Sequence, residues 1–281
     1  MKKVAVIGTG IMGNAIATNF LKKGYEVYIW NRSKNKLKNL IKLGGIATGN
    51  PFEATQKADI VFEVTANDKS SKLVWIAKNG ILAGANSKKV LITCATLSAS
   101  WTDKLASICK KKKLTFFDVP MTGSRIGAES GKLTLLVGGN KKKTETIKKD
   151  LGVISEKIFY FGKVGFGMRY KHLLNMLQAI HIIGFGEVLS VAKKVGLNIK
   201  AVGNALAERP GGTTTNLAWR DYQKEPNPIN FSVEWITKDL TYAKQLAKGI
   251  KSPFLDESLK KYKNAIKKNL GREDWTVVNK I

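Results

Sequence analysis

The chain has 281 residues, a length that suits two domains better than one or three. Hydrophobic residues make up 43% of it, which is enough to fill a substantial core and excludes a mainly disordered protein. Lysine and arginine number 48 against 21 acidic residues, so the formal net charge is +27.

This positive charge is spread along the whole chain, with short lysine runs at residues 110–113 and 141–143. A nucleic-acid-binding protein more often concentrates its charge on a tail or on one face. We therefore expect a solvated lysine surface and no specific nucleic-acid partner, with weak, salt-sensitive binding of polyanions as the alternative. A positive field also steers an anionic cofactor and an anionic substrate towards their site.

Neither a membrane segment nor a targeting segment is expected. No uninterrupted apolar run reaches the roughly 18–20 residues that a membrane span needs. The first residues run directly into a strand pattern, without the apolar stretch and cleavage site of a signal peptide. The two cysteines, Cys94 and Cys109, indicate neither a disulfide framework nor a metal site, so we expect a reducing cytoplasm.

Short β-branched runs alternate with amphipathic stretches through the first part of the chain. Strands are predicted at residues 3–7, 26–30, 60–64, 90–93, 114–118, 133–137 and 158–161. Helices are predicted at residues 12–23 and 34–43, after the strands at 60–64 and 90–93, and from about Lys141. Strands that alternate with helices indicate an α/β fold with a mostly parallel, doubly wound sheet.

The pattern changes after Gly165. Residues 168–195 contain no proline and place apolar residues at helical spacing, which predicts a long helix that ends at Gly196. The remaining residues predict helices joined by turns such as Pro210-Gly211-Gly212 and Pro226-Asn227-Pro228. We therefore predict an α/β domain over residues 1–164 and an all-helical domain over residues 165–281.

A glycine-rich turn follows the first predicted strand and opens the first predicted helix. Its sequence, Gly8-Thr9-Gly10-Ile11-Met12-Gly13, has the G-x-G-x-x-G pattern of dinucleotide-binding loops. The first glycine allows the tight turn, the second lets the backbone approach a pyrophosphate, and the third lets the helix pack on the strand. The helix N-terminus then stabilises the phosphates. The motif predicts a Rossmann-type domain that binds a nicotinamide dinucleotide.

The end of the second predicted strand bears on the choice between NADH and NADPH. NAD-dependent enzymes carry an acid there, about 20 residues past the loop, that accepts from the ribose 2′-OH. This chain has Asn31, Arg32 and Ser33 instead. Asn31 does not repel a 2′-phosphate, Arg32 can grip the phosphate or stack on adenine, and Ser33 can donate. NADPH is the predicted cofactor, and a merely solvated Arg32 is the alternative.

Four motifs in this order resemble those of the β-hydroxyacid dehydrogenases, the family of the 3-hydroxyisobutyrate dehydrogenases and the glyoxylate/succinic semialdehyde reductases. The motifs are the glycine loop, Asp118-Val-Pro-Met-Thr-Gly-Ser124, Lys171-His-Leu-Leu-Asn175 and Lys238-Asp239-Leu240. The second motif has Thr122 for the usual Ser and Ser124 for the usual Gly, and this Gly-Ser version is most similar to the glyoxylate/succinic semialdehyde reductase branch.

The resemblance implies that Lys171 and Asn175 are the catalytic residues, and the chemistry agrees. Hydride transfer to a carbonyl leaves growing negative charge on oxygen, where an acid must donate a proton. An ordinary lysine pKa of about 10.4 favours donation. Partial burial beside a cationic ring would lower the pKa of Lys171 and let it act as a base too. Asn175 projects from the same helix face and can hold the substrate oxygen or the lysine.

The substrate is predicted to carry a carboxylate. Thr122 offers a hydroxyl group, and Gly123 and Ser124 offer backbone N–H groups. The resemblance places Lys238 beside both the cofactor and the substrate. The expected substrates are succinic semialdehyde, glyoxylate or methylmalonate semialdehyde, or the corresponding hydroxyacids. A simple chain reversal at residues 122–124 is the alternative.

Two threonines complete the predicted cofactor contacts. The resemblance places Thr96 at the nicotinamide, next to Ala95 where the family usually has Ser. Thr65 directly follows the predicted strand at residues 60–64.

Two other functions remain open. Imine reductases share this architecture, but they usually place Asp or Tyr where Lys171 stands. A basic nucleic-acid-associated protein with a vestigial Rossmann domain is the alternative from a different class, and the intact glycine loop argues against it. The long helix of the second domain predicts an apolar face buried in a second copy, and hence a homodimer or homotetramer.

Overall fold

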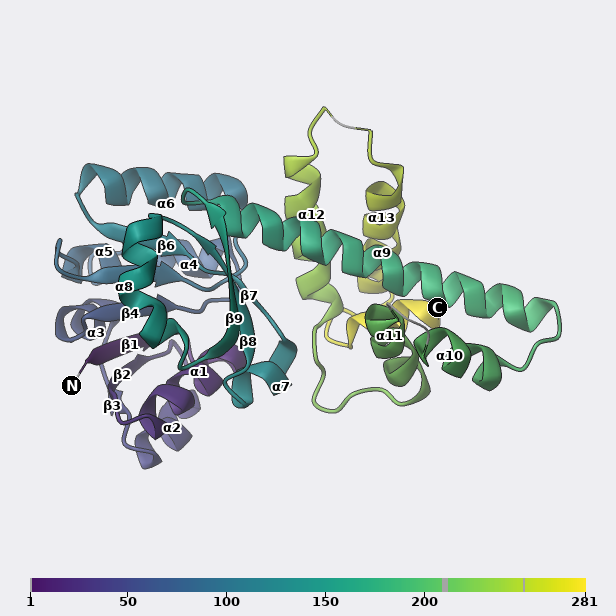
Figure 1. The fold of residues 1–281 in the computed structure, drawn as a ribbon, viewed down its shortest axis with the longest axis horizontal. Helices are drawn as coiled ribbons and strands as arrows, with labels where there is room; N and C mark the ends of the chain where they lie inside the picture. The colour runs from purple at the N-terminus through teal and green to yellow at the C-terminus, as the bar shows by residue number, and fades with distance from the viewer. Residues whose placement is uncertain (1, 209–211, 250) are drawn as a thin grey trace. The chain divides into compact units, whose positions relative to one another are not determined.

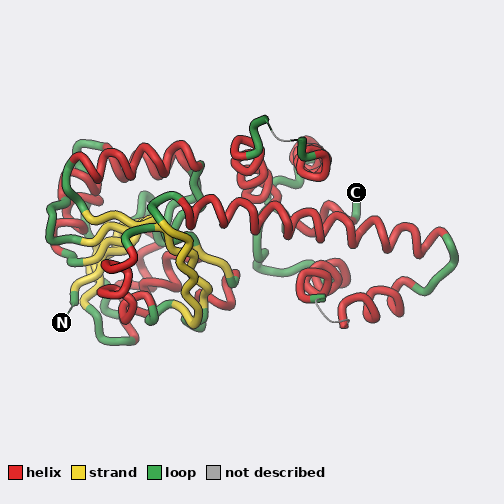
Figure 2. The backbone as a smooth tube through the Cα atoms, turned by 45° about the horizontal axis from the view of Figure 1, so that its top comes forward, coloured by secondary structure: helices red, strands yellow, loops and turns green. Residues whose placement is uncertain are grey.

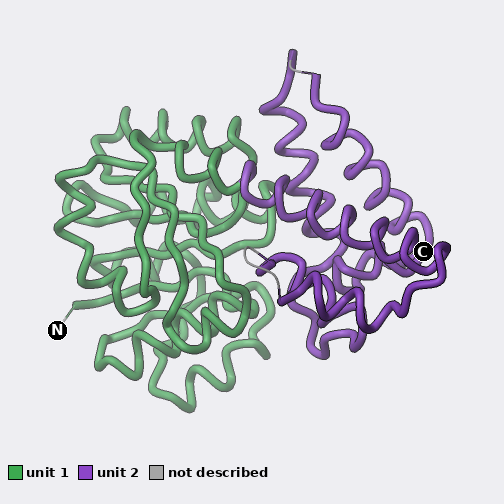
Figure 3. Tube along the Cα trace, turned by 45° about the vertical axis from the view of Figure 1, so that its right-hand side comes forward, with its two compact units in different colours: residues 1–171 green, residues 172–281 purple. Residues whose placement is uncertain are grey.

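The structure, a computed structural model, describes residues 2–208, 212–249 and 251–281. By its internal contacts the chain divides into two units, residues 1–171 and 172–281 (Figure 3). This division falls inside the first helix after residue 165, because Met168 belongs to the core of the N-terminal unit. The domain boundary before residue 165 stays a prediction. The predicted turn at Pro210 and Gly211 lies outside the described residues.

One nine-stranded sheet forms the centre of the N-terminal unit, in the order β3-β2-β1-β4-β5-β6-β8-β7 with β9 beside β8 (Figure 1). The strands are β1 (Lys3–Ile7), β2 (Glu26–Trp30), β3 (Ile46–Ala47), β4 (Ile60–Glu63), β5 (Val90–Thr93), β6 (Thr115–Asp118), β7 (Met121–Thr122), β8 (Leu133–Gly138) and β9 (Ser155–Gly162). β1 to β6 are parallel, whereas β8 is antiparallel to β6 and β7. The predicted α/β fold with a mostly parallel sheet is confirmed.

Helices cover both faces of this sheet. They are α1 (Ile11–Lys22), α2 (Lys38–Lys42), α3 (Pro51–Lys57), α4 (Asp68–Ile76), α5 (Ile81–Gly84), α6 (Ala99–Lys111), α7 (Ser124–Glu129) and α8 (Lys141–Leu151). Val4 and Val6 of β1 pack in one core with α1 and α8, while Ala5 and Ile7 pack in a second core with α3 to α6. Strands buried on both faces read as continuous apolar runs, which is why the sequence revealed them.

The structure differs from the predicted elements in short segments. The helix expected over residues 34–43 is a 3-10 turn, η1 (Lys34–Leu37), followed by the short α2. Strands β3 and β7 were not predicted, because two residues are too few to show a periodicity.

The strand order reverses between β1 and β4, which are neighbours in the sheet. In open parallel sheets a ligand crevice forms at such a switch point, beyond the carboxyl ends of the strands. The loops that begin at this edge follow β1, β4 and β5. They carry the glycine loop, Thr65 and Thr96, so the topology brings the predicted cofactor residues to one edge of the sheet.

The C-terminal unit is helical, and the strands that the structure describes all precede it (Figure 2). Its elements are α9 (Phe166–Lys194), whose first residues belong to the N-terminal unit, α10 (Ile199–Glu208), α11 (Thr213–Gln223), α12 (Val233–Leu246), α13 (Pro253–Lys267) and the 3-10 turn η2 (Trp275–Asn279). Ile182 of α9, Trp219 of α11, Ile236 of α12 and Tyr262 of α13 share its core. The predicted helical second domain is confirmed.

Helix α9 is long and apolar enough to cross a membrane, by length and composition alone. Its most apolar window has a mean hydropathy of 1.4, although charged and polar residues interrupt its apolar runs. One such helix is weak evidence, since the core helices of globular proteins pass the same test. α9 also buries the polar side chains of Lys171 and Asn175, and Asn175 hydrogen-bonds a carboxylate on α12. Only 39% of the apolar window is buried, so α9 packs partly in the core and leaves other apolar side chains exposed.

Candidate active site

Two glycines shape the loop between β1 and α1. Gly8 has a φ of +99°, and a Cβ at this position would lie 2.4 Å from the carbonyl oxygen of Val64. A Cβ on Gly13 would lie 1.8 Å from the carbonyl oxygen of Gly8. Both contacts are with backbone atoms, which cannot move aside. Glycine is therefore required at Gly8 by conformation and close approach, and at Gly13 by helix–strand packing, as the motif predicted.

Gly10 differs from the other two glycines because it borders open space. It is exposed, and a Cβ there would meet no atom within 4 Å. It is also the N-cap residue of α1 and provides no side-chain cap for the first N–H groups of that helix. Ile11 beside it is exposed, while Met12 packs against the core. Uncapped N–H groups next to open space are what a dinucleotide pyrophosphate requires.

The end of β2 holds the glycine loop in place. The Thr9 N–H donates to Asn31 Oδ1 at 3.1 Å, and Asn31 Nδ2 donates to the Ser33 carbonyl oxygen at 3.1 Å. Asn31 therefore acts on the loop itself, a role that the sequence pattern did not show. Arg32 and Ser33 are exposed, and residues 31–36 contain three basic side chains and no acidic one. The end of β2 is therefore uncharged at Asn31 and basic in the residues that follow.

A buried carboxyl group lies behind the loops that follow β4 and β5. Glu63, the last residue of β4, is fully buried and accepts hydrogen bonds from the hydroxyl groups of Thr65 and Thr93. Burial raises the pKa of Glu63, although the two hydroxyl hydrogen bonds lower it. Thr65 and the predicted nicotinamide contact Thr96 are both half-buried. Glu63 was not predicted as a site residue; its only signal in the sequence is a lone acid in the apolar run Ile60-Val-Phe-Glu-Val64.

Asp118, which opens the second motif, is a structural anchor. It is buried at the end of β6 and accepts from the backbone N–H groups of Gly165 at 2.6 Å and Met168 at 2.7 Å. Burial raises its pKa to about 7, while these hydrogen bonds and the charge of Arg169 lower it. Asp118 therefore ties the end of β6 to the start of α9.

The predicted carboxylate-binding residues follow Asp118 directly. Thr122 ends β7 and is half-buried, whereas Gly123 and Ser124 are exposed. Gly123 has a φ of +125° and is the N-cap residue of α7, and Ser124 has a φ of +55°. The segment thus turns sharply from strand to helix, with two consecutive residues in the left-handed region.

The predicted catalytic residues lie one turn apart on α9. Lys171 and Asn175 are only 8% and 3% exposed. Asn175 Nδ2 donates to Asp239 Oδ2 on α12 at 2.6 Å, and Lys238 Nζ lies 3.1 Å from Asp239 Oδ1. Asp239 is itself buried, so one carboxylate joins Asn175 to Lys238. The sequence motif contained Asp239 without indicating this function.

The described residues contain no group of three or more His, Cys, Asp or Glu side chains that could hold a metal ion. Cys94 and Cys109 are both buried and free, and burial raises the pKa of each thiol. Thiols of this kind are poor nucleophiles.

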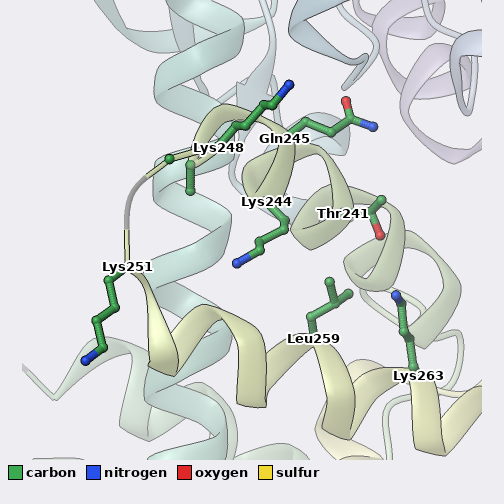
Figure 4. A pocket seen from close by; sticks show the side chains of 9 residues that line it. Thr241, Lys244, Gln245, Lys248, Lys251, Leu259 and Lys263 are labelled. Atoms are coloured by element: carbon green, nitrogen blue, oxygen red, sulfur yellow. The ribbon is translucent and has the colours of Figure 1, made fainter.

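A separate hollow lies between α12 and α13 (Figure 4). Its volume is about 630 Å³, and its lining includes Lys244, Lys248, Lys251 and Lys263. Lys244 pairs with Asp256 at 2.5 Å. None of the predicted site residues lines this hollow, so it is not part of the candidate active site.

The sheet topology and the glycine loop at the switch point define an NAD(P)-binding Rossmann protein. Residues 3–162 match the family model described as the NAD binding domain of 6-phosphogluconate dehydrogenase. Residues 165–280 match the model described as the NAD-binding region of NADP-dependent 3-hydroxyisobutyrate dehydrogenase. The chain therefore belongs to the β-hydroxyacid dehydrogenase family of NAD(P)-dependent oxidoreductases, as the resemblance implied.

Individual relatives agree with this family. The chloroplastic glyoxylate/succinic semialdehyde reductase 2 of Arabidopsis thaliana is 29% identical to the chain, covering 98% of the chain and 78% of that relative. The Mycobacterium tuberculosis 3-hydroxyisobutyrate dehydrogenase, solved with L-serine, has a TM-score of 0.89 at 20% identity and covers 100% and 98% of the two chains. An imine reductase from Myxococcus stipitatus has a TM-score of 0.62 at 18% identity and covers 100% and 99%. At these identities, the two structures show a shared fold only.

Proposed function

We propose that the protein transfers a hydride between NADPH and a small aldehyde that carries a carboxylate, or the corresponding hydroxyacid. Succinic semialdehyde, glyoxylate and methylmalonate semialdehyde are the proposed substrates. The observation that carries this proposal is the buried pair Lys171 and Asn175 on α9, with Asn175 held by Asp239. Burying a lysine is costly, so a buried lysine in an oxidoreductase of this family points to proton transfer.

The preference for NADPH rests on the end of β2. An acid there would bind the 2′-OH of NADH and repel a 2′-phosphate. In this chain Asn31 is uncharged and already bonded to Thr9, while Arg32 is exposed and available to a phosphate. Arginine binds phosphate through charge-assisted, bidentate hydrogen bonds.

The proposed reduction divides the work between cofactor and protein. Bound NADPH supplies the hydride to the carbonyl carbon. Lys171 donates a proton from its ammonium group to the carbonyl oxygen, and takes it back from the hydroxyl group in the reverse direction. One N–H of the Asn175 amide donates to Asp239, which fixes the orientation of the amide group. Its second N–H can still donate to the substrate oxygen, and its Oδ1 can accept from the ammonium group of Lys171.

We further propose that the segment 122–124 and Lys238 bind the substrate carboxylate. The Thr122 hydroxyl and the N–H groups of the sharp turn at Gly123 and Ser124 are donors, and Lys238 adds a positive charge. Thr122→Val removes one donor at nearly constant volume. It should weaken binding of a semialdehyde acid by about tenfold and leave a neutral aldehyde of similar size unaffected. Equal losses for both aldehydes would remove the segment from carboxylate recognition.

The direct test is a substrate panel. Small semialdehydes are assayed with NADPH and NADH, and hydroxyacids with the oxidised cofactors, with kcat/KM as the readout. The proposal expects NADPH-dependent reduction of at least one carboxylate-bearing semialdehyde and a much lower kcat/KM for a neutral aldehyde. Activity only on neutral carbonyl compounds, or only with NADH, would contradict it.

An imine reductase is the second candidate, because the fold is shared with such enzymes. Lys171 argues against it, since the proton donor at this position is usually Asp or Tyr in that class. Cyclic imines therefore belong in the same panel, and reduction of an imine in preference to every aldehyde would replace the proposal.

We also propose that the protein is a homodimer or homotetramer. Large apolar side chains on α9 are exposed, among them Leu173, Leu177, Val188, Val191 and Val195. A patch of this kind on a single helix is typical of a protein interface. Light scattering tests the proposal, and a monomeric mass would refute it. The cytoplasmic location and the lack of a specific nucleic-acid partner stay predictions; tight DNA binding at physiological salt would contradict the latter.

A further inference from the structure

A buried carboxyl group stands at the switch point of the sheet without a role in the proposed proton transfer. Glu63 ends β4 and lies in register between Ile7 of β1 and Thr93 of β5. The Val64 N–H donates to the Ile7 carbonyl oxygen at 2.8 Å, and the carbonyl oxygen of Val64 is the atom that excludes a side chain at Gly8. The backbone next to Glu63 therefore supports the glycine loop.

The carboxyl group of Glu63 makes three hydrogen bonds to two threonines. Oε1 accepts from the hydroxyl group of Thr65 and from its backbone N–H at 3.2 Å. Oε2 accepts from the hydroxyl group of Thr93 on the neighbouring strand. The Glu63 side chain thus holds the start of the loop after β4 in place. It also links this loop to β5, the strand that precedes Thr96.

Fold stability alone does not call for an acid at this position. A fully buried carboxyl group is desolvated at a considerable cost, and desolvation is the main reason that its pKa is raised. The neighbouring residues Ile60, Val61 and Phe62 are apolar and buried. A leucine at position 63 would suit these apolar neighbours, but it would leave the hydroxyl group and N–H of Thr65 without this partner. It would also remove the interaction with the buried Trp75 side chain of α4, which lowers the pKa of Glu63.

We propose that Glu63 is a positioning residue for the nicotinamide cofactor. Its hydrogen bonds to Thr65 and Thr93 fix the conformation of the loop at residues 64–67, which follows β4 at the switch point. The inference rests on the proposed function, since it assumes that the dinucleotide lies against this edge of the sheet. The second half of a doubly wound sheet, which β4 opens, receives the nicotinamide half of a dinucleotide. Glu63 thus acts on the cofactor through Thr65 and does not touch the reacting atoms.

The test compares NADPH dissociation constants, measured by titrating the fluorescence of bound NADPH. Glu63→Leu should raise the dissociation constant by about tenfold, the effect of one hydrogen bond that no longer orders the loop. Glu63→Gln should stay within about threefold of wild type, because an amide can still pair with both hydroxyl groups after they rotate. In steady state Glu63→Leu should raise KM for NADPH and leave kcat at saturation nearly unchanged.

A double-mutant cycle distinguishes positioning of Thr65 by Glu63 from a general destabilisation of the fold. Thr65→Val should weaken NADPH binding in the wild-type background, and should add little in the Glu63→Leu background, because both changes break the same link. Independent, additive effects would overturn the inference. If Glu63→Leu does not fold, Thr93→Val serves instead, since it removes one partner of the carboxyl group without altering the loop. NADPH binding by Thr93→Val at wild-type strength would then overturn the inference.

Asp150 on α8 is a matched control. It is also a buried carboxylate of the N-terminal unit, and it accepts from Lys2 at 2.6 Å and from the Tyr25 hydroxyl group at 3.0 Å. Asp150→Asn should change NADPH affinity little, whatever it costs in stability. Wild-type protein that binds neither NADPH nor NADH would refute the proposed function itself. Wild type that binds NADPH, together with Glu63→Leu that binds equally well, would refute only the role of Glu63.

Discussion

The two regions that carry the candidate site hold their polar groups in different ways. At the carboxyl edge of the sheet, the backbone forms the site. Gly8 and Gly13 allow the loop its tight packing against backbone atoms, and Gly10 borders open space. On α9 and α12, side chains form it, with Asp239 holding Asn175 and Lys238. Backbone N–H groups bind phosphate but do not exchange protons with a substrate, whereas a lysine does. Substitutions at the sheet edge should therefore change binding, and substitutions on α9 should change the rate.

The largest expected effect is on the rate. Lys171→Ala should lower kcat by about 10²–10⁴-fold, the usual contribution of a positioned general acid. NADPH affinity should hardly change, because the phosphate-binding loop belongs to the other region. Stopped-flow reduction at saturating substrate and an NADPH titration measure the two quantities. Lys193→Ala, an exposed residue near the end of the same helix, is the control. A near wild-type kcat for Lys171→Ala would show that α9 does not supply the proton donor.

The next effect is on cofactor choice at the sheet edge. Arg32→Ala should lower kcat/KM for NADPH roughly 10- to 150-fold, because a hydrogen bond to a charged group contributes about 1.5–3 kcal/mol. The value for NADH should stay nearly constant. Adding Asn31→Asp should reverse the preference, since a carboxylate repels the 2′-phosphate but can still accept the Thr9 N–H. Equal losses with both cofactors, or a wild type that prefers NADH, would show that Arg32 does not read the phosphate.

Two glycines in one loop allow a sharper test of the backbone site. Gly13→Ala should destabilise the fold by about 1–3 kcal/mol, because its Cβ overlaps the Gly8 carbonyl oxygen. Gly10→Ala should keep the thermal midpoint of wild type, since its Cβ enters open space, and should weaken NADPH binding. Thermal unfolding and NADPH titration on the same samples distinguish the two. Similar midpoints for both variants would contradict the assigned packing.

The smallest expected effect concerns Asp118, which ties the sheet edge to the start of α9. Its folded pKa of about 7 lies above the unfolded value of about 3.9. Between these values the folded state binds more protons than the unfolded state, so this group makes the free energy of unfolding fall as pH rises from about 4 to about 7. Asp118→Asn should flatten this dependence in denaturant titrations at about pH 5 and about pH 7. If the free energy of unfolding of Asp118→Asn depends on pH as in wild type, the dependence comes from other buried acids. Glu63 and Asp274 are examples, because their pKa values are also raised.

Features that are local in the chain could be predicted from the amino-acid sequence. The α/β pattern and the strand–glycine–helix unit at residues 3–22 follow from spacing and from residue type alone. So does the helical second domain. The motif around Lys171 and Asn175 placed two polar side chains one turn apart, because helix geometry depends only on the separation of four residues.

The polar groups that support these features could not be predicted, because they come together only in the folded chain. Glu63 meets Thr93 across 30 residues, and Asn175 meets Asp239 across 64. Neither pair has a sequence signature, because strand register and helix packing are set by the whole core. The same is true of Asn31, whose amide holds Thr9 only once β2 lies beside β1. A buried polar group forms hydrogen bonds with the groups that the fold brings close to it. The periodicity of apolar residues along the chain does not indicate which groups these are.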